Sequence, residues 1–195
     1  MKMNANIGIG FLTFLLCEVL MAEPLPQNWV TIRDEQTGIQ VDFPHSPLEM
    51  TFEIPFQNTP LTGQIHLYSF PTQTGILVLS IYTSQQLNDN WLKKENFYQF
   101  FETILVPHLF FNPAIFYDHQ TFTYEPKQIN GEKAASFQIS HRDQEDVKKL
   151  EGIAMIRENT LYTYFYLTSE KSFDQELFKR FLNSVLFQKV RRPEV

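Results

Sequence analysis

The spacing of the hydrophobic residues changes along this chain, and the order of those changes most constrains its fold. Apolar and polar residues alternate in a first series of short stretches, which is typical of half-buried strands. These stretches are residues 29–33, 38–43, 50–54, 62–70 and 75–83. Between residues 91 and 105 the spacing becomes helical instead. One face of that segment carries Phe97, Phe100, Phe101, Ile104 and Leu105.

The second half of the chain repeats the order of strands followed by a helix. Strands are expected at residues 120–124, 133–141, 148–157 and 161–168. Ser172 and Gln175 have the spacing of a capping box and predict the start of a second helix. Short turns at 71–74 and 158–160 predict two hairpins. Strands joined by short turns favour an α+β fold, with an antiparallel sheet and two helices packed on it.

Residues 1–22 have the pattern of a secretory signal peptide, which leaves residues 23–195 as one α+β domain. An apolar stretch of ten residues, 7–16, is too short to span a bilayer, and small Ala22 offers a cleavage point. Cys17 follows the apolar stretch directly, so lipidation there is the competing interpretation, and a retained anchor is a third. We therefore expect an exported protein, periplasmic or secreted, without a transmembrane segment in the mature chain.

The composition of the chain argues against two further classes of protein. The formal net charge is −6, which argues against a nucleic-acid binder and against a polybasic membrane-surface protein. Cys17 is the one cysteine, so no disulfide is expected despite export. There is also no Asn-x-Ser/Thr sequon, and both absences together are more typical of a bacterial protein.

The pattern of elements resembles the PsbP-like family in its broad sense. The residues that carry the resemblance are Val41-x-Phe43-Pro44-x-x-Pro47, the turn at 131–135, Arg157 before an aromatic strand, and Phe181-x-Asn183-Ser184 in the last helix. This resemblance implies a PsbP-like α/β/α sandwich and a general accessory or assembly role. It implies no catalytic residue and no substrate.

We find no catalytic or metal-binding motif in the sequence, and we expect neither a cofactor nor a metal. The five histidines form no zinc-ligand pattern, and we expect His66 to be solvent-facing or simply hydrogen-bonded. Serine nucleophile motifs are absent. We expect the carboxylates Asp34-Glu35 and those between 143 and 146 to form solvated surface. An enzyme would need a site assembled by the fold, for example from His141, Asp143 and a serine.

Aromatic residues supply the candidate binding surfaces. Tyr162, Tyr164 and Tyr166 share one face of a strand whose other face is also apolar. The simpler interpretation is a central strand covered on both sides; the functional one is an exposed tyrosine surface. Phe110 and Phe111, held between Pro107 and Pro113, are the second candidate, either as core or as a contact loop.

The sequence thus predicts a non-catalytic exported binding or accessory protein whose partner is another protein of the envelope or the exterior. The alternative is a carrier of a small ligand or lipid, held under the helices against the sheet. An enzyme with a fold-assembled site is the third hypothesis.

Overall fold

The computed structural model describes residues 29–55, 62–101, 121–129, 131–143 and 146–187. Helical elements are few in this part of the chain. They are η1 (Asp89–Leu92), α2 (Lys94–Phe100), η3 (Glu170–Ser172) and α5 (Gln175–Asn183). The strands are β1 (Val30–Arg33), β2 (Ile39–Phe43), β3 (Leu48–Pro55), β4 (Thr62–Pro71), β5 (Gly75–Thr83), β6 (Thr121–Ile129), β7 (Glu132–Asp143), β8 (Asp146–Arg157), β9 (Thr160–Ser169) and β10 (Leu186–Phe187).

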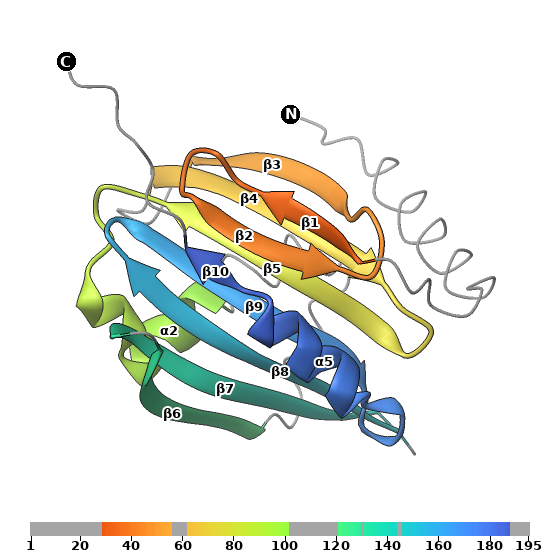
Figure 1. Ribbon diagram of the computed structural model, residues 1–195. Helices are drawn as coiled ribbons and strands as arrows, with labels where there is room; N and C mark the ends of the chain where they lie inside the picture. The colour runs from red at the N-terminus through yellow and green to blue at the C-terminus, as the bar shows by residue number, and fades with distance from the viewer. Residues whose placement is uncertain (1–28, 56–61, 102–120, 130, 144–145, 188–195) are drawn as a thin grey trace, which may run out of the picture.

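Seven of the strands form one antiparallel sheet in the order β3-β4-β5-β9-β8-β7-β6 (Figure 1). Two hairpins expected from the sequence are confirmed, β4–β5 and β8–β9. The aromatic strand β9 takes the central position, because it pairs with β5 on one side and β8 on the other. The edges of this sheet are β3 and β6.

A second, three-stranded sheet joins the two ends of the described chain. Its order is β1-β2-β10, so the strand after α5 pairs with β2. The backbone N–H of Asp42 in β2 donates to Ser184 Oγ at 2.9 Å, and the ring of Phe43 packs on Phe181 of α5. The strand β10 was not expected from the sequence, because two residues are too few to show a period.

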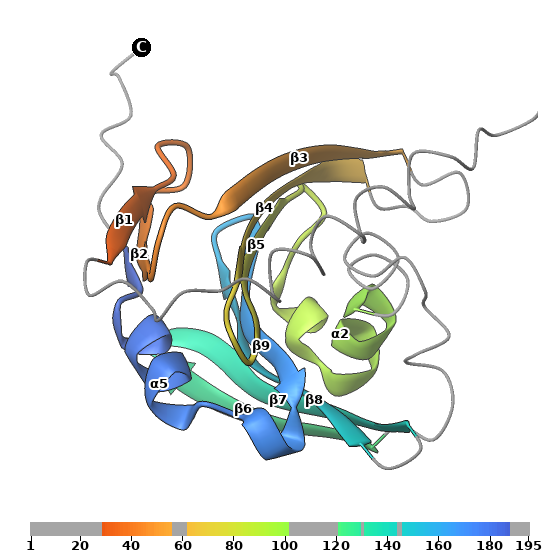
Figure 2. The same cartoon turned by 90° about the vertical axis from the view of Figure 1, so that its right-hand side faces the viewer.

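The two faces of the large sheet are covered by different elements (Figure 2). Helix α2 covers one face, and its buried Phe97 and Phe100 join a core that includes Phe137 and Phe165. Helix α5 and the small sheet cover the other face, where Phe181 packs with the tyrosines of β9. The predicted α+β fold, with two helices packed on an antiparallel sheet, is confirmed.

Two details of the helices differ from the sequence expectation. The α-helix begins at Lys94 and not at residue 91, because a 3₁₀ turn over Asp89–Leu92 precedes α2, and Ile104 and Leu105 lie outside the described residues. Helix α5 begins after Asp174, whose carboxylate accepts from the N–H of Leu177 at 2.9 Å. Ser172 belongs to η3 instead, so the capping-box prediction was wrong.

Within the described residues, we find no helix long and apolar enough to cross a membrane.

Candidate functional site: an open edge of the large sheet

Strand β3 is a long edge strand with continuous pairing on its inner side. All eight of its residues pair with β4 in one register, from Leu48 opposite Ser69 to Pro55 opposite Thr62. No strand in the described part of the chain pairs with its outer side. An edge of this kind presents a row of backbone N–H and C=O groups that can pair with another chain.

The side chains of β3 fall into two rows because strand residues alternate between faces. Met50 and Phe52 pack against the core beneath α2, and Leu48, in the same row, is 38% exposed. Glu49, Thr51 and Glu53 form the opposite row and are exposed. One face of this edge is therefore apolar and the other is acidic.

The opposite edge of the sheet, β6, is built differently. Its pairing with β7 is also continuous, but Pro126 lies in its middle, opposite Ala135. Proline has no N–H to donate, and a proline is a common protection of an edge strand. The exposed Pro126 in the middle of β6 therefore makes this strand a poorer template for strand addition.

A polar cluster lies behind the acidic row of β3, in the turn between β1 and β2. Asp34 is buried there and accepts from both the backbone N–H and the hydroxyl of Thr37, each at 2.8 Å. Its other carboxylate oxygen lies 3.9 Å from His66 Nδ1 on β4. His66 is opposite Thr51 of β3, and the next residue of that face, Tyr68, is opposite Glu49. The expectation that Asp34 forms solvated surface was wrong, because the turn folds its side chain inward.

The buried environment and the nearby carboxylates shift the pKa of two tyrosines of this cluster, Tyr68 and Tyr162. Burial, and then the charges of Asp34 and Glu49, hold the pKa of Tyr68 well above its usual value. Burial also raises the pKa of Tyr162, while hydrogen bonds to Thr37 and Thr160 act in the opposite direction. These phenols therefore remain protonated hydrogen-bond donors beside a carboxylate.

The pair Asp34 and His66 lies where the turn after β1 meets the large sheet. At 3.9 Å the contact is longer than a hydrogen bond. The Nε2 atom of His66 is buried and has no described hydrogen-bond partner. His66 is only partly exposed and lies on the face opposite Ile65 and Leu67, as alternation predicts.

The tyrosines proposed as a partner surface are in the interior. Tyr162, Tyr164 and Tyr166 are at most 3% exposed and lie beneath α5 and the small sheet. The hypothesis that they form an exposed binding face was wrong, because the chain closes over the central strand from both sides. The simpler interpretation, a covered central strand, is confirmed for these residues.

Several other candidates lie outside the described residues or side chains. Phe110, Phe111 and Cys17 belong to segments that the structure does not describe. The backbones of His141 and Asp143 are in β7, but their side chains are outside the description. Among the described residues, no group of three or more His, Cys, Asp and Glu side chains could hold a metal ion.

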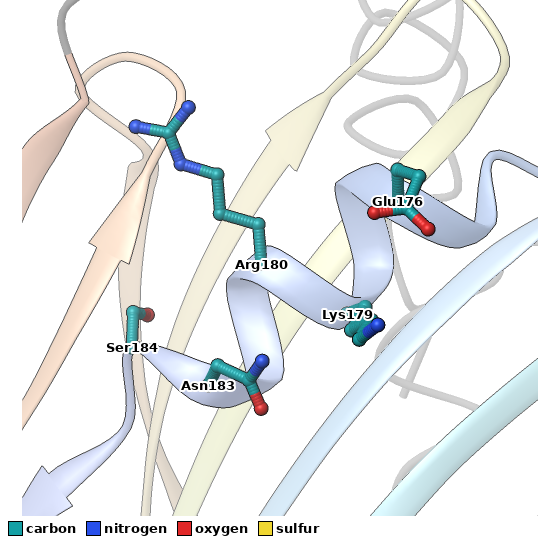
Figure 3. A pocket seen from close by; sticks show the side chains of 5 residues that line it. All are labelled: Glu176, Lys179, Arg180, Asn183 and Ser184. Atoms are coloured by element: carbon teal, nitrogen blue, oxygen red, sulfur yellow. The ribbon is translucent and has the colours of Figure 1, made fainter.

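A shallow hollow of about 390 Å³ lies on the outer face of α5 (Figure 3). Its described lining residues are Glu176, Lys179, Arg180, Asn183 and Ser184. Arg180 extends away from Lys179, and its guanidinium lies 4.2 Å from the centre of the Trp29 ring. Ser184 is occupied by its bonds to Asp42 and Phe181. These two side chains therefore fasten α5 to the small sheet.

Comparisons with known proteins give little beyond this geometry. No protein-family model matches the chain, and no curated protein matches it. Among solved structures, it is similar to a protein of unknown function from Pseudomonas aeruginosa, with 11% identity and a TM-score of 0.33. That match covers 74% of this chain and 85% of the other.

Sequence reasoning recognised the strand that forms this site but missed its role. The alternation of Met50, Phe52 and Ile54 is visible in the sequence, with Thr51 and Glu53 between them. What the sequence lacks is the position of the strand in the sheet, because edge and inner strands can share the same alternation.

Proposed function

We propose that this chain is a non-catalytic, exported binding or accessory domain with a PsbP-like fold, and that it holds an extended segment of a protein partner along β3. The observation that carries the proposal is the contrast between the edges of the large sheet. β3 carries no proline before its last paired residue, Pro55, whereas β6 has Pro126 in its middle. Addition of a strand to an exposed sheet edge is a recurrent mode of peptide recognition.

The interior of the fold supports a role at the surface. The aromatic residues on the inner face of each helix pack against aromatic rings of the strands. Phe97 packs on Phe137 with ring centroids 4.9 Å apart, and Phe43 packs on Phe181 at 5.1 Å. In the described part of the chain, these rings therefore pack against one another and do not line a cavity for a small ligand or lipid. This favours the binding module over the carrier.

Site-specific photo-crosslinking tests the proposal in the envelope of the producing cell. A photoreactive residue is placed in the full chain at Leu48, at Thr51 or, as the control, at Thr123 on β6. Strand addition predicts one saturable partner protein from the two β3 positions, and the cross-linked partner residue shifts by about three positions between them, as the pairing of strands requires.

Three results of that experiment would overturn the proposal. The first is an absence of cross-links from β3, and the second is an equal yield from Thr123. The third is a cross-link to a second copy of this chain, which would make the edge a self-association surface.

Export is tested separately by the intact mass of the chain recovered from the envelope. Loss of residues 1–22 is the expected result. A chain that begins at Cys17 with a diacylglycerol-sized addition would establish a lipoprotein instead. An unprocessed chain in the cytoplasm would contradict export.

A further inference from the structure

We infer that the segment bound along β3 alternates apolar residues with lysine or arginine. This inference rests on the proposed function and adds the chemistry of the partner. It follows from the two side-chain rows of the edge, because a strand added to β3 places its own side chains beside those rows.

The apolar row specifies half of the partner's residues. Met50 and Phe52 are partly buried against the core beneath α2, while Leu48 at the start of β3 is 38% exposed. These side chains extend the core as far as the rim of the sheet. A partner residue opposite them gains most if it is apolar, since it removes the remaining exposed area from water.

The acidic row specifies the other half. Glu49 and Glu53 are both exposed and are separated by Thr51, so the two carboxylates stand on one face. Neither forms an ion pair with a lysine or arginine of the described chain. Tyr68, which lies next to Glu49 on this face, also faces the carboxylate of Asp34. Cations opposite Glu49 and Glu53 would meet carboxylates that have no lysine or arginine partner among the described residues.

The same row disfavours a second copy of this chain as the occupant. Residues directly opposite each other in an antiparallel pair point to the same face, so β3 paired with itself brings the two acidic rows together. With Thr51 on the two-fold axis, Glu49 lies opposite the partner's Glu53. Like charges in directly opposite positions destabilise a pair of strands. A basic segment from another protein has the complementary charge.

Three synthetic peptides of the same length as β3 test the inference on the full chain. One alternates valine with lysine, one valine with serine and one valine with glutamate. Fluorescence anisotropy should show that the valine–lysine peptide binds about five- to tenfold more tightly than the valine–serine peptide, as expected for two opposite-charge pairs. Raising the salt concentration should reduce that difference, because exposed charges are screened.

Glu53→Lys, which leaves the neighbourhood of Tyr68 unchanged, should remove most of the preference for lysine and improve binding of the valine–glutamate peptide. Glu125→Lys on β6 is the matched control and should change neither affinity. Circular dichroism and the denaturant midpoint verify that both variants are folded.

The outcomes separate the inference from the proposed function. Equal affinities for the three peptides overturn the charge pattern, and the proposed function survives if the photo-crosslinks still shift in step along β3. Binding that Glu53→Lys leaves unaltered also overturns the inference, since the peptide then lies elsewhere. Self-association in place of peptide binding overturns both.

Discussion

Asp34 and His66 face each other across the junction of the small and the large sheet, with Asp34 Oδ2 lying 3.9 Å from His66 Nδ1. Asp34 belongs to the turn after β1, and His66 belongs to β4, the neighbour of the edge strand. This contact places a buried carboxylate directly behind the open edge. It also makes the β1–β2 turn a structural support of that edge.

Asp34→Ala should therefore lower the free energy of unfolding by about 2 kcal/mol, because a buried group that accepts two hydrogen bonds is lost. Urea denaturation measures the change. Glu35→Ala is the control, since the adjacent carboxylate is exposed, and it should change stability by less than about 0.5 kcal/mol. Equal effects of the two substitutions would show that Asp34 does not hold the turn.

The central tyrosines offer a matched pair of deletions of one hydroxyl. Tyr166 Oη hydrogen-bonds with the hydroxyls of Thr72 and Thr74, whereas the hydroxyl of Tyr164 is buried and has no described hydrogen-bond partner. Tyr166→Phe should cost about 1 kcal/mol, and Tyr164→Phe should be neutral or slightly stabilising. Thermal unfolding of the two variants compares them, and a larger loss for Tyr164→Phe would contradict this assignment.

The start of α5 can be tested in the same way. Asp174→Ala should destabilise the chain by about 1 kcal/mol, because it removes the carboxylate that accepts from the N–H of Leu177. Ser172→Ala should have almost no effect, since Ser172 lies in η3 and not at the helix cap. The reverse order of the two denaturant midpoints would restore the capping box that the sequence indicated.

Alkaline pH should destabilise the fold through its buried tyrosines, and Tyr124 is one of them. Burial, and to a smaller extent the charge of Glu95, raises the pKa of Tyr124 to about 12. In the unfolded chain a tyrosine ionises near pH 10, so between about pH 10 and 12 the unfolded state loses a proton that the folded state keeps. The contribution of Tyr124 to the free energy of unfolding is therefore fully present below this window and is lost as the pH rises through it.

Urea midpoints measured across that window detect the effect. The decline should be shallower in Tyr124→Phe, which has no phenol to ionise, although it also loses the hydrogen bond that Tyr124 donates to the carbonyl of Leu92. A decline as steep as in the parent chain would mean that other groups dominate.

Gly152 tests the packing of the central strands. A Cβ at this position would lie 2.6 Å from the carbonyl oxygen of Tyr164 and 2.6 Å from the ring of Phe137. Because backbone cannot move aside easily, Gly152→Ala should cost about 1–3 kcal/mol. Gly131→Asn is the comparison, since Gly131 has φ of +84° and open space around it, and asparagine tolerates that conformation. Equal midpoints would contradict the close approach.

Most strands of this fold could be predicted from the sequence, because alternation reports directly which residues share a face. The interpretation of β9 shows this well. Apolar residues on both faces predicted a central strand, and the structure places β9 between β5 and β8. The small sheet was less accessible, since its third strand, Leu186–Phe187, shows no period.

The candidate site could not be predicted, for a physical reason. The sequence shows which face each residue of β3 occupies but not which strands lie beside it. It also gave no signal that Asp34 turns inward, because neighbouring Asp34 and Glu35 look alike and only the three-dimensional turn buries the first of them.

Hydrogen exchange of the backbone amides in the full chain tests the central claim most directly. It is measured with and without the valine–lysine peptide. Strand addition predicts that exchange slows at alternate amides of β3, whose N–H groups point away from β4, and remains unchanged along β6. Unchanged exchange in β3 with slowing elsewhere would contradict the claim that β3 is the binding edge.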